Sequence, residues 1–285
     1  MTGRAKGRTF ETADGLRLFY RDFGADRSGT PVVCLPGLTR NSRDFDDVAA
    51  RMASRRRVVT MDFRGRGHSD PDPDWRNYHP GTYVADVGAL LDALEIPRVI
   101  VLGTSLGGIC GMVMSALPGE RVAGVILNDV GPEIHPAGLA RVQAYTGRAE
   151  PVGSWAEALA QAKQTYGDAL PGLDEAGFAK VARNTYREDA QGVPRLDLDL
   201  AIGRAVRELP PPGGDPWQLF AALRDLPVTL LWGVLSDILT ADIVERMQAE
   251  KPDLEVVRVP NRGHVPLLDE PECLAAIDGF LDRVA

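Results

Sequence analysis

The sequence predicts an α/β protein with a doubly wound, mostly parallel sheet, and two observations carry that prediction. Short continuous apolar runs recur along the chain, and such runs are typical of strands buried on both faces of a sheet. Stretches with helical spacing of apolar residues separate most of these runs. Strand and helix in alternation indicate parallel strands joined by crossover helices on both sides of the sheet. The expected buried strands lie near residues 31–37, 56–63, 98–104, 124–129, 228–233 and 255–260.

The segment before the first buried run has a different pattern. Apolar Leu16, Leu18 and Tyr20 alternate with polar residues that include Arg17 and Arg21. Alternation of this kind predicts an antiparallel strand with one exposed face. The sequence Ala-Asp-Gly just before it indicates a hairpin turn.

One interval is much longer than the others. About 100 residues separate the run at 124–129 from the run at 228–233, whereas most connections have roughly 2 to 6 residues. We expect helices in this interval near 137–147, 154–167, 174–189 and 197–208. We therefore predict a helical cap at residues 132–215, inserted between two parts of one α/β core at 1–131 and 216–285.

Composition and charge narrow the classes of function. The chain has 285 residues with 40 acidic and 32 basic side chains, a net charge of -8, so it offers no basic face for nucleic acid. No apolar stretch approaches the roughly 20 residues that cross a bilayer, and no apolar run follows the N-terminus, so we expect no membrane contact. Cys34, Cys110 and Cys273 lie far apart, as reduced thiols of a cytoplasmic protein do. We expect a monomer or a small homo-oligomer.

The stretch Val-Leu-Gly-Thr-Ser-Leu-Gly-Gly, at 101–108, is the strongest functional signal. Glycines in a helix cost about 1 kcal/mol each relative to alanine, so helix stability does not explain them. A serine on a sharp turn between a strand and a helix has its hydroxyl exposed at the sheet edge, and Gly103 and Gly107 avoid clashes there. We predict that Ser105 is a nucleophile.

A serine nucleophile requires a base and an acid that orients the base. His264 follows the last predicted strand, so its loop opens on the same edge as Ser105. We favour Asp237, after the penultimate strand, as the acid, because the order Ser, Asp, His is typical of this turn. Asp129, at the end of another strand, is the alternative. His68, His79 and His135 are expected in turns and loops, without a role in catalysis.

Two backbone amides are expected to stabilise a developing oxyanion. The first is the amide of Leu106, at the start of the helix after the serine. The second is the amide of Leu38, in the loop after the first parallel strand.

Four motifs together resemble the α/β-hydrolase superfamily. LPGLTRNSRDF resembles the oxyanion loop of that family, and MDFRGRGHSD resembles its D-x-R-G-x-G-x-S turn. GTSLGG resembles its nucleophile elbow, and NRGHVPLLDEP resembles its histidine loop. The resemblance implies Ser105 as nucleophile, His264 as base, Asp237 as acid, and Leu38 and Leu106 as oxyanion donors. Pro36 stands where the family usually has histidine. The segment from Gly233 to Asp237 is one residue longer than the commonest spacing in the family.

The chemistry that follows is acyl transfer without a metal or cofactor. We predict hydrolysis of a carboxylic ester or lactone with a fairly apolar acyl part, bound by Tyr145, Trp155, Tyr186 and Trp217 of the cap. Two alternatives stay open. One is a carbon–carbon bond hydrolase of ring-cleavage products, for which arginines in the cap would bind a carboxylate, and the other is a small-molecule receptor without turnover.

Overall fold

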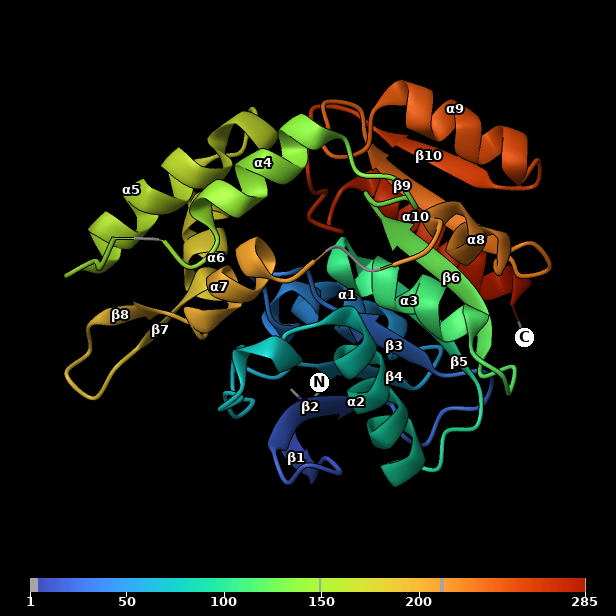
Figure 1. The fold of residues 1–285 in the computed structure, drawn as a ribbon, viewed down its shortest axis with the longest axis horizontal. Helices are drawn as coiled ribbons and strands as arrows, with labels where there is room; N and C mark the ends of the chain where they lie inside the picture. The colour runs from blue at the N-terminus through green and yellow to red at the C-terminus, as the bar shows by residue number, and fades with distance from the viewer. Residues whose placement is uncertain (1–4, 149, 211–212, 285) are drawn as a thin grey trace.

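A computed structural model of the chain describes residues 5–148, 150–210 and 213–284. Its centre is an eight-stranded sheet in the order β1-β2-β4-β3-β5-β6-β9-β10 (Figure 1). The strands from β4 to β10 run parallel, whereas β2 is antiparallel to both β1 and β4, which confirms the predicted fold class and the antiparallel edge. The strand bounds are Gly7–Glu11 (β1), Arg17–Phe23 (β2), Val32–Leu35 (β3), Val58–Met61 (β4), Val99–Thr104 (β5), Val122–Asn128 (β6), Val228–Gly233 (β9) and Glu255–Val259 (β10).

Helices cover both faces of this sheet. Successive residues of each buried strand point to opposite sides, so the apolar side chains on both sides must be covered. In β5, Ile100 and Leu102 pack into the hydrophobic cluster of α1 and α10, while Val99 and Val101 pack into the cluster of α2, α3, α8 and α9. The helix bounds are Asp46–Met52 (α1), Pro80–Ala93 (α2), Leu106–Ala116 (α3), Pro216–Ala221 (α8), Ala241–Glu250 (α9) and Pro271–Arg283 (α10). Two single-turn helices, Ser42–Phe45 (η1) and Trp75–Asn77 (η2), lie in the connections.

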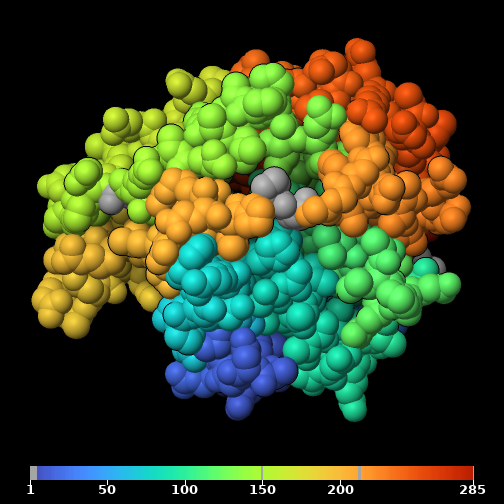
Figure 2. Space-filling view, in the orientation of Figure 1, coloured from blue at the N-terminus to red at the C-terminus, as the bar shows by residue number. Residues whose placement is uncertain are grey.

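We call the predicted cap, residues 132–215, the inserted segment, and its described residues contribute no strand to the large sheet. It contains its own two-stranded sheet and small hydrophobic clusters of its own. In Figure 2 it covers one side of the molecule, with its yellow-green and gold atoms directly against the core. Its elements are Pro136–Tyr145 (α4), Trp155–Tyr166 (α5), Gly167–Ala169 (η3), Glu175–Thr185 (α6), Tyr186–Glu188 (β7), Pro194–Leu196 (β8) and Ala201–Glu208 (α7).

A hairpin replaces parts of two helices that the sequence predicts in this segment. The helix expected over 174–189 ends at Thr185 and continues as β7, and the helix expected over 197–208 begins only at Ala201. The turn between β7 and β8 explains the difference, because the Asp189 carboxylate accepts hydrogen bonds from the amides of Gln191 and Val193. A side chain that binds nearby amides in this way competes with helix formation.

Among the described residues, no helix is both long enough and apolar enough to cross a lipid bilayer. The three cysteines lie buried and form no disulfide with one another.

Candidate active site

Ser105 occupies a strained turn between β5 and α3. Its φ of 50° and ψ of -112° lie in a region that residues with a side chain rarely adopt. Neighbouring glycines make this turn possible: a Cβ on Gly103 would lie 2.4 Å from the backbone of Gly107, and a Cβ on Gly107 would lie 2.0 Å from the carbonyl oxygen of Leu35. The glycine spacing therefore has the steric origin that the sequence predicts.

His264 lies against this serine. The loop after β10 brings its Nε2 to 3.0 Å from Ser105 Oγ, and the imidazole is only 8% exposed. This geometry allows the imidazole to accept the hydroxyl proton when its Nδ1 carries the other proton. The other three histidines lie elsewhere: His68 contacts Arg187 and His79 caps α2, while His135 precedes α4.

The carboxylate that contacts His264 belongs to Asp129. Its Oδ2 lies 2.8 Å from His264 Nδ1, and its side chain is completely buried. Strand register explains the position, because Thr104 of β5 pairs with Asn128 of β6, so that Ser105 and Asp129 follow directly at adjacent strand ends. The amide of Gly233 and the hydroxyl of Ser236 also donate hydrogen bonds to Asp129, at 2.9 and 2.7 Å.

This placement corrects the prediction that Asp237 is the acid. The Asp237 carboxylate instead forms a two-point ion pair with Arg141 of α4, at 2.5 and 2.8 Å. Hydrogen bonds from Arg141 lower the pKa of Asp237 from its usual range. The residue before it, Ser236, turns toward Asp129, so the longer loop after β9 supports the acid rather than supplying it. The sequence does contain a sign of this arrangement. Asp129 ends a predicted strand at the same sheet edge as Ser105, and for that reason it was the alternative acid.

The loop with Leu38 lies on the other side of the serine. Leu38 lines the same cavity as Ser105, and Leu106 is the first residue of α3, where amides have no partner within the helix. Arg66 is a supporting residue that the sequence analysis missed. Its guanidinium is buried and donates from Nε to the Leu38 carbonyl oxygen at 3.0 Å, which fixes the orientation of that peptide. Tyr83 in turn contacts Arg66, at 2.9 Å.

A cavity of about 120 Å³ lies in front of Ser105 and His264, between the core and the inserted segment. Tyr145 lines it, and so does Tyr166, another aromatic residue of the inserted segment. The rest of its apolar wall comes from α4, the connection between α5 and α6, α6 itself and the histidine loop. These apolar lining residues include Val142, Leu170, Leu173, Val181, Pro266 and Leu267.

Three other aromatic residues predicted to bind substrate lie away from this cavity. Trp155 donates to Glu188 on the outer side of the inserted segment, with the Arg183 guanidinium over its ring. Trp217, on α8, has the Arg246 guanidinium over its ring. Tyr186 faces a second cavity. These placements correct the prediction for Trp155 and Trp217 and put Tyr186 outside the Ser105 cavity, because helical spacing alone does not say which face of a helix meets the core.

Two cations line the Ser105 cavity, and both have carboxylate partners. Arg40 forms a two-point ion pair with Asp44, with both distances 2.7 Å. Lys180 lies 2.7 Å from Asp47 and 3.4 Å from Asp269. The wall around Ser105 therefore presents no unpaired cation among the described residues that line it.

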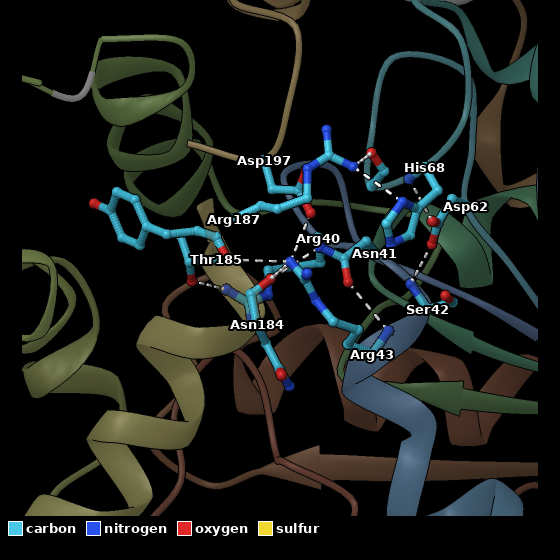
Figure 3. A network of polar contacts seen from close by, with 12 residues as sticks. Arg40, Asn41, Ser42, Arg43, Asp62, His68, Asn184, Thr185, Arg187 and Asp197 are labelled. Carbon is cyan, nitrogen blue, oxygen red and sulfur yellow. Dashed lines mark hydrogen bonds and ion pairs between the residues drawn. The ribbon is translucent and has the colours of Figure 1, made fainter. Parts of the chain in front are cut away.

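Polar contacts connect the inserted segment to the loop after β3 (Figure 3). The Asn41 amide donates to the carbonyl oxygen of Asn184, at 2.8 Å, and Arg43 forms an ion pair with buried Asp197, at 2.6 Å. Arg187 lies 3.3 Å from the same carboxylate. Because the loop after β3 also carries Leu38, the position of the inserted segment is coupled to that side of the site.

Within the part of the chain that the structure describes, no three His, Cys, Asp or Glu side chains converge as a metal site. The serine on a strand–turn–helix, facing a histidine and a buried carboxylate at the edge of a doubly wound sheet, defines the α/β-hydrolase class of fold. A family model described as alpha/beta hydrolase fold matches residues 30–271. The chain belongs to this family.

Known proteins resemble the chain over nearly its whole length. It is 31% identical to a 3-hydroxybutyrate-oligomer hydrolase of Cupriavidus necator, over 93% of this chain and 92% of that protein. It is 27% identical to a 2-(acetamidomethylene)succinate hydrolase of Mesorhizobium japonicum, over 90% of this chain and 89% of that protein. The crystal structure of an alpha/beta hydrolase from Novosphingobium aromaticivorans is 40% identical, covers all of both chains and has a TM-score of 0.94.

Proposed function

We propose that this protein is a serine hydrolase that cleaves a carboxylic ester or lactone through an acyl-enzyme on Ser105. The observation that carries the proposal is the continuous chain of contacts from Asp129 to His264 and from His264 to Ser105, at 2.8 and 3.0 Å. A buried carboxylate, an imidazole and a hydroxyl in this order activate the hydroxyl for attack on a carbonyl.

The reaction proceeds in two steps. Ser105 Oγ attacks the ester carbonyl carbon while His264 Nε2 takes the hydroxyl proton, and the amides of Leu38 and Leu106 stabilise the oxyanion. His264 then gives its proton to the departing alcohol, which leaves an acyl group on Ser105. In the second step His264 takes a proton from water as that water attacks the acyl group, and it then gives this proton to Ser105 Oγ, which releases the free acid and restores the serine hydroxyl. In both steps the Asp129 carboxylate accepts a hydrogen bond from the Nδ1–H group of His264 and stabilises the positive charge that forms on the ring.

The walls of the Ser105 cavity favour an uncharged ester unit. Tyr145 and Tyr166 contribute aromatic surface, and the two-point ion pair of Arg40 with Asp44 occupies the guanidinium that lines the cavity. One relative is named as a hydrolase of 3-hydroxybutyrate oligomers, which are linear ester chains. That likeness supports esters of short hydroxy acids as the substrate class.

The decisive experiment is hydrolysis of p-nitrophenyl esters from acetate to decanoate by the wild type and by Ser105→Ala. We expect the rate to be highest for one short chain length, and we expect the variant to lose about 10⁵-fold or more in kcat, as nucleophile loss does. If the variant kept more than about 3% of the wild-type activity, Ser105 would not be the nucleophile.

The two alternatives predict different results. Hydrolysis of a vinylogous diketo acid without any ester hydrolysis would favour a carbon–carbon bond hydrolase. Tight binding of a small molecule without turnover would favour a receptor on the same fold.

A further inference from the structure

A second cavity lies inside the inserted segment, next to the one at Ser105. Its volume is about 310 Å³, against about 120 Å³ for the Ser105 cavity. Residues of α4, α5 and the β7–β8 hairpin enclose it, together with Thr39 from the loop after β3. No residue proposed for the chemistry lines it, so it is a separate space that needs its own explanation.

The two cavities share a wall. Thr39, Tyr145 and Tyr166 line both of them, and the two tyrosine rings stand edge to face with their centres 6.3 Å apart. Arg40 extends along the same partition: it lines the Ser105 cavity and donates to the hydroxyl of Thr185, which lines the second cavity, at 2.5 Å. The second cavity is therefore adjacent to the Ser105 cavity through this shared wall.

One side of the second cavity is fixed to the core. Thr185 lies beside Asn184, which is bound by Asn41, and Figure 3 shows Arg40, Asn41 and Arg43 facing this part of the inserted segment. The opposite side consists of α4 and α5, which carry the two tyrosines at their C-terminal ends. A substrate that displaces the tyrosine rings would therefore move side chains of α4 and α5, and also Arg40, whose guanidinium lies over the Tyr166 ring.

The lining of the second cavity is rich in hydrogen-bonding groups, unlike the apolar wall near Ser105. Gln161, Gln164 and Thr165 contribute amide and hydroxyl groups, and all three lie on α5. At the rim, Arg148 and Glu150 supply one cation and one carboxylate, and neither has an ion-pair partner in the described ranges of the chain. Donors and acceptors are present together without an excess of either charge, which suits an uncharged polar chain.

We propose that the second cavity binds the continuation of a linear hydroxy-acid ester whose reacting unit lies at Ser105. This inference rests on the proposed function, because that function places the reacting ester unit next to Ser105. The next units of such a chain carry ester carbonyls that accept hydrogen bonds from the Gln164 amide and the Tyr145 hydroxyl, because the Thr165 hydroxyl already donates to the Gln161 carbonyl oxygen. Burial raises the pKa of Tyr145, so its hydroxyl stays protonated and able to donate at neutral pH.

A large side chain at position 144 would fill the second cavity without entering the Ser105 cavity. Ala144 lies on α4, is exposed to solvent and lines the second cavity but not the first. Ala140, one turn earlier on the same helix, is also exposed and lines neither of the two cavities. Ala144→Trp and Ala140→Trp are therefore matched variants that place the same bulk inside and outside the proposed site. Gln164→Trp fills the same cavity from α5.

The test compares kcat/KM for p-nitrophenyl butyrate, which has one short acyl chain, with kcat/KM for the linear trimer of 3-hydroxybutyrate. We expect Ala144→Trp and Gln164→Trp to lower the trimer-to-butyrate ratio about tenfold, and Ala140→Trp to leave it at the wild-type value. A ratio that stays constant in both filling variants would overturn the proposal. A larger loss with p-nitrophenyl decanoate than with the trimer would also overturn it, because the cavity would then bind an apolar tail.

A binding measurement separates this inference from the proposed function. With Ser105→Ala protein, calorimetric titration of the trimer measures affinity without cleavage, and adding Ala144→Trp should raise Kd about tenfold. If the wild type cleaved no ester but this shift occurred, the binding site would stand and the hydrolase function would fall. If the wild type cleaved butyrate but the shift were absent, the function would stand and the second site would fall.

Discussion

The core and the inserted segment place their functional residues by different means. In the core, Ser105 and Asp129 follow paired residues of adjacent strands, so the hydrogen bonds of the sheet determine their separation. In the inserted segment, small hydrophobic clusters hold α5 and α6, Ile202 and Ala205 of α7 pack into the hydrophobic cluster of the core, and ion pairs or amide contacts also join the segment to the core. From the proposed function and this difference we expect the chemistry to depend on the sheet edge and substrate selection to depend on the inserted segment.

The strongest test of this comparison replaces the acid at the sheet edge. Asp129→Asn keeps the shape of the side chain but cannot stabilise a charged His264 ring, so kcat for p-nitrophenyl butyrate should fall by about 10³- to 10⁴-fold. Asp237→Asn is the matched control, because it removes a carboxylate from the loop after β9 without touching His264. A larger loss of kcat in Asp237→Asn would restore Asp237 as the acid.

The second prediction concerns the steric requirement of the turn. Gly107→Ala places a Cβ 2.0 Å from the Leu35 carbonyl oxygen, and backbone atoms there have no room to move. We expect a loss of several kcal/mol, about 2 to 4, in the free energy of unfolding, measured in urea, together with lower soluble yield.

Gly88→Ala is the control for that experiment. Gly88 lies in α2, and a Cβ there would meet no atom within 4 Å. Alanine at this helix position should stabilise the protein by about 0.5 to 1 kcal/mol. Equal behaviour of the two variants would show that the crowding at Gly107 is not what selects glycine.

The sequence predicts the core of this site better than its periphery, for a physical reason. The positions of Ser105 and His264 follow from strand ends and glycine spacing, which are local properties of the chain. The choice between Asp129 and Asp237 depends on whether the loop after β9 turns inward through Ser236 or outward to Arg141, and that is decided by contacts between distant elements.

The aromatic residues of the inserted segment were predicted less well for the same reason. The orientation of its helices depends on contacts such as Asn41 with Asn184, which are 143 residues apart in the chain. Helical periodicity identifies an apolar face but not its neighbour. Tyr145 lines the Ser105 cavity, while Trp155 and Trp217 lie away from it.

The third prediction tests Ser236 as a positioning residue for the acid. Its hydroxyl donates to the same Asp129 oxygen that contacts His264, and it accepts hydrogen bonds from the amides of Ile238 and Leu239. Ser236→Ala should lower kcat about tenfold with little change in KM, because the acid loses one of its donors. Ser236→Thr retains the hydroxyl and should recover most of the activity. A merely structural role would lower stability in Ser236→Ala without changing the pH profile of kcat.

The smallest expected effect belongs to the ion pair between Arg141 and Asp237, which joins α4 to the core. Both side chains are about one-third exposed, at 34% and 39%, so solvent screens their attraction. We expect a double-mutant cycle of Arg141→Gln and Asp237→Asn to give a coupling energy below about 1 kcal/mol at pH 7.

The pH dependence of that coupling has a definite sign. Arg141 lowers the pKa of Asp237 in the folded protein, so the stabilisation is fully present above the usual aspartate range and is lost as the pH falls through the lowered value. Urea unfolding should therefore show that the coupling energy becomes smaller as the pH is lowered below about 4. At pH 7, kcat for p-nitrophenyl butyrate should stay within about twofold of wild type in both single variants. A coupling that grew on acidification would mean that another group holds α4 in place. A large loss of kcat in Arg141→Gln would mean that the inserted segment positions the chemistry as well as the substrate, which would break the division between the two regions.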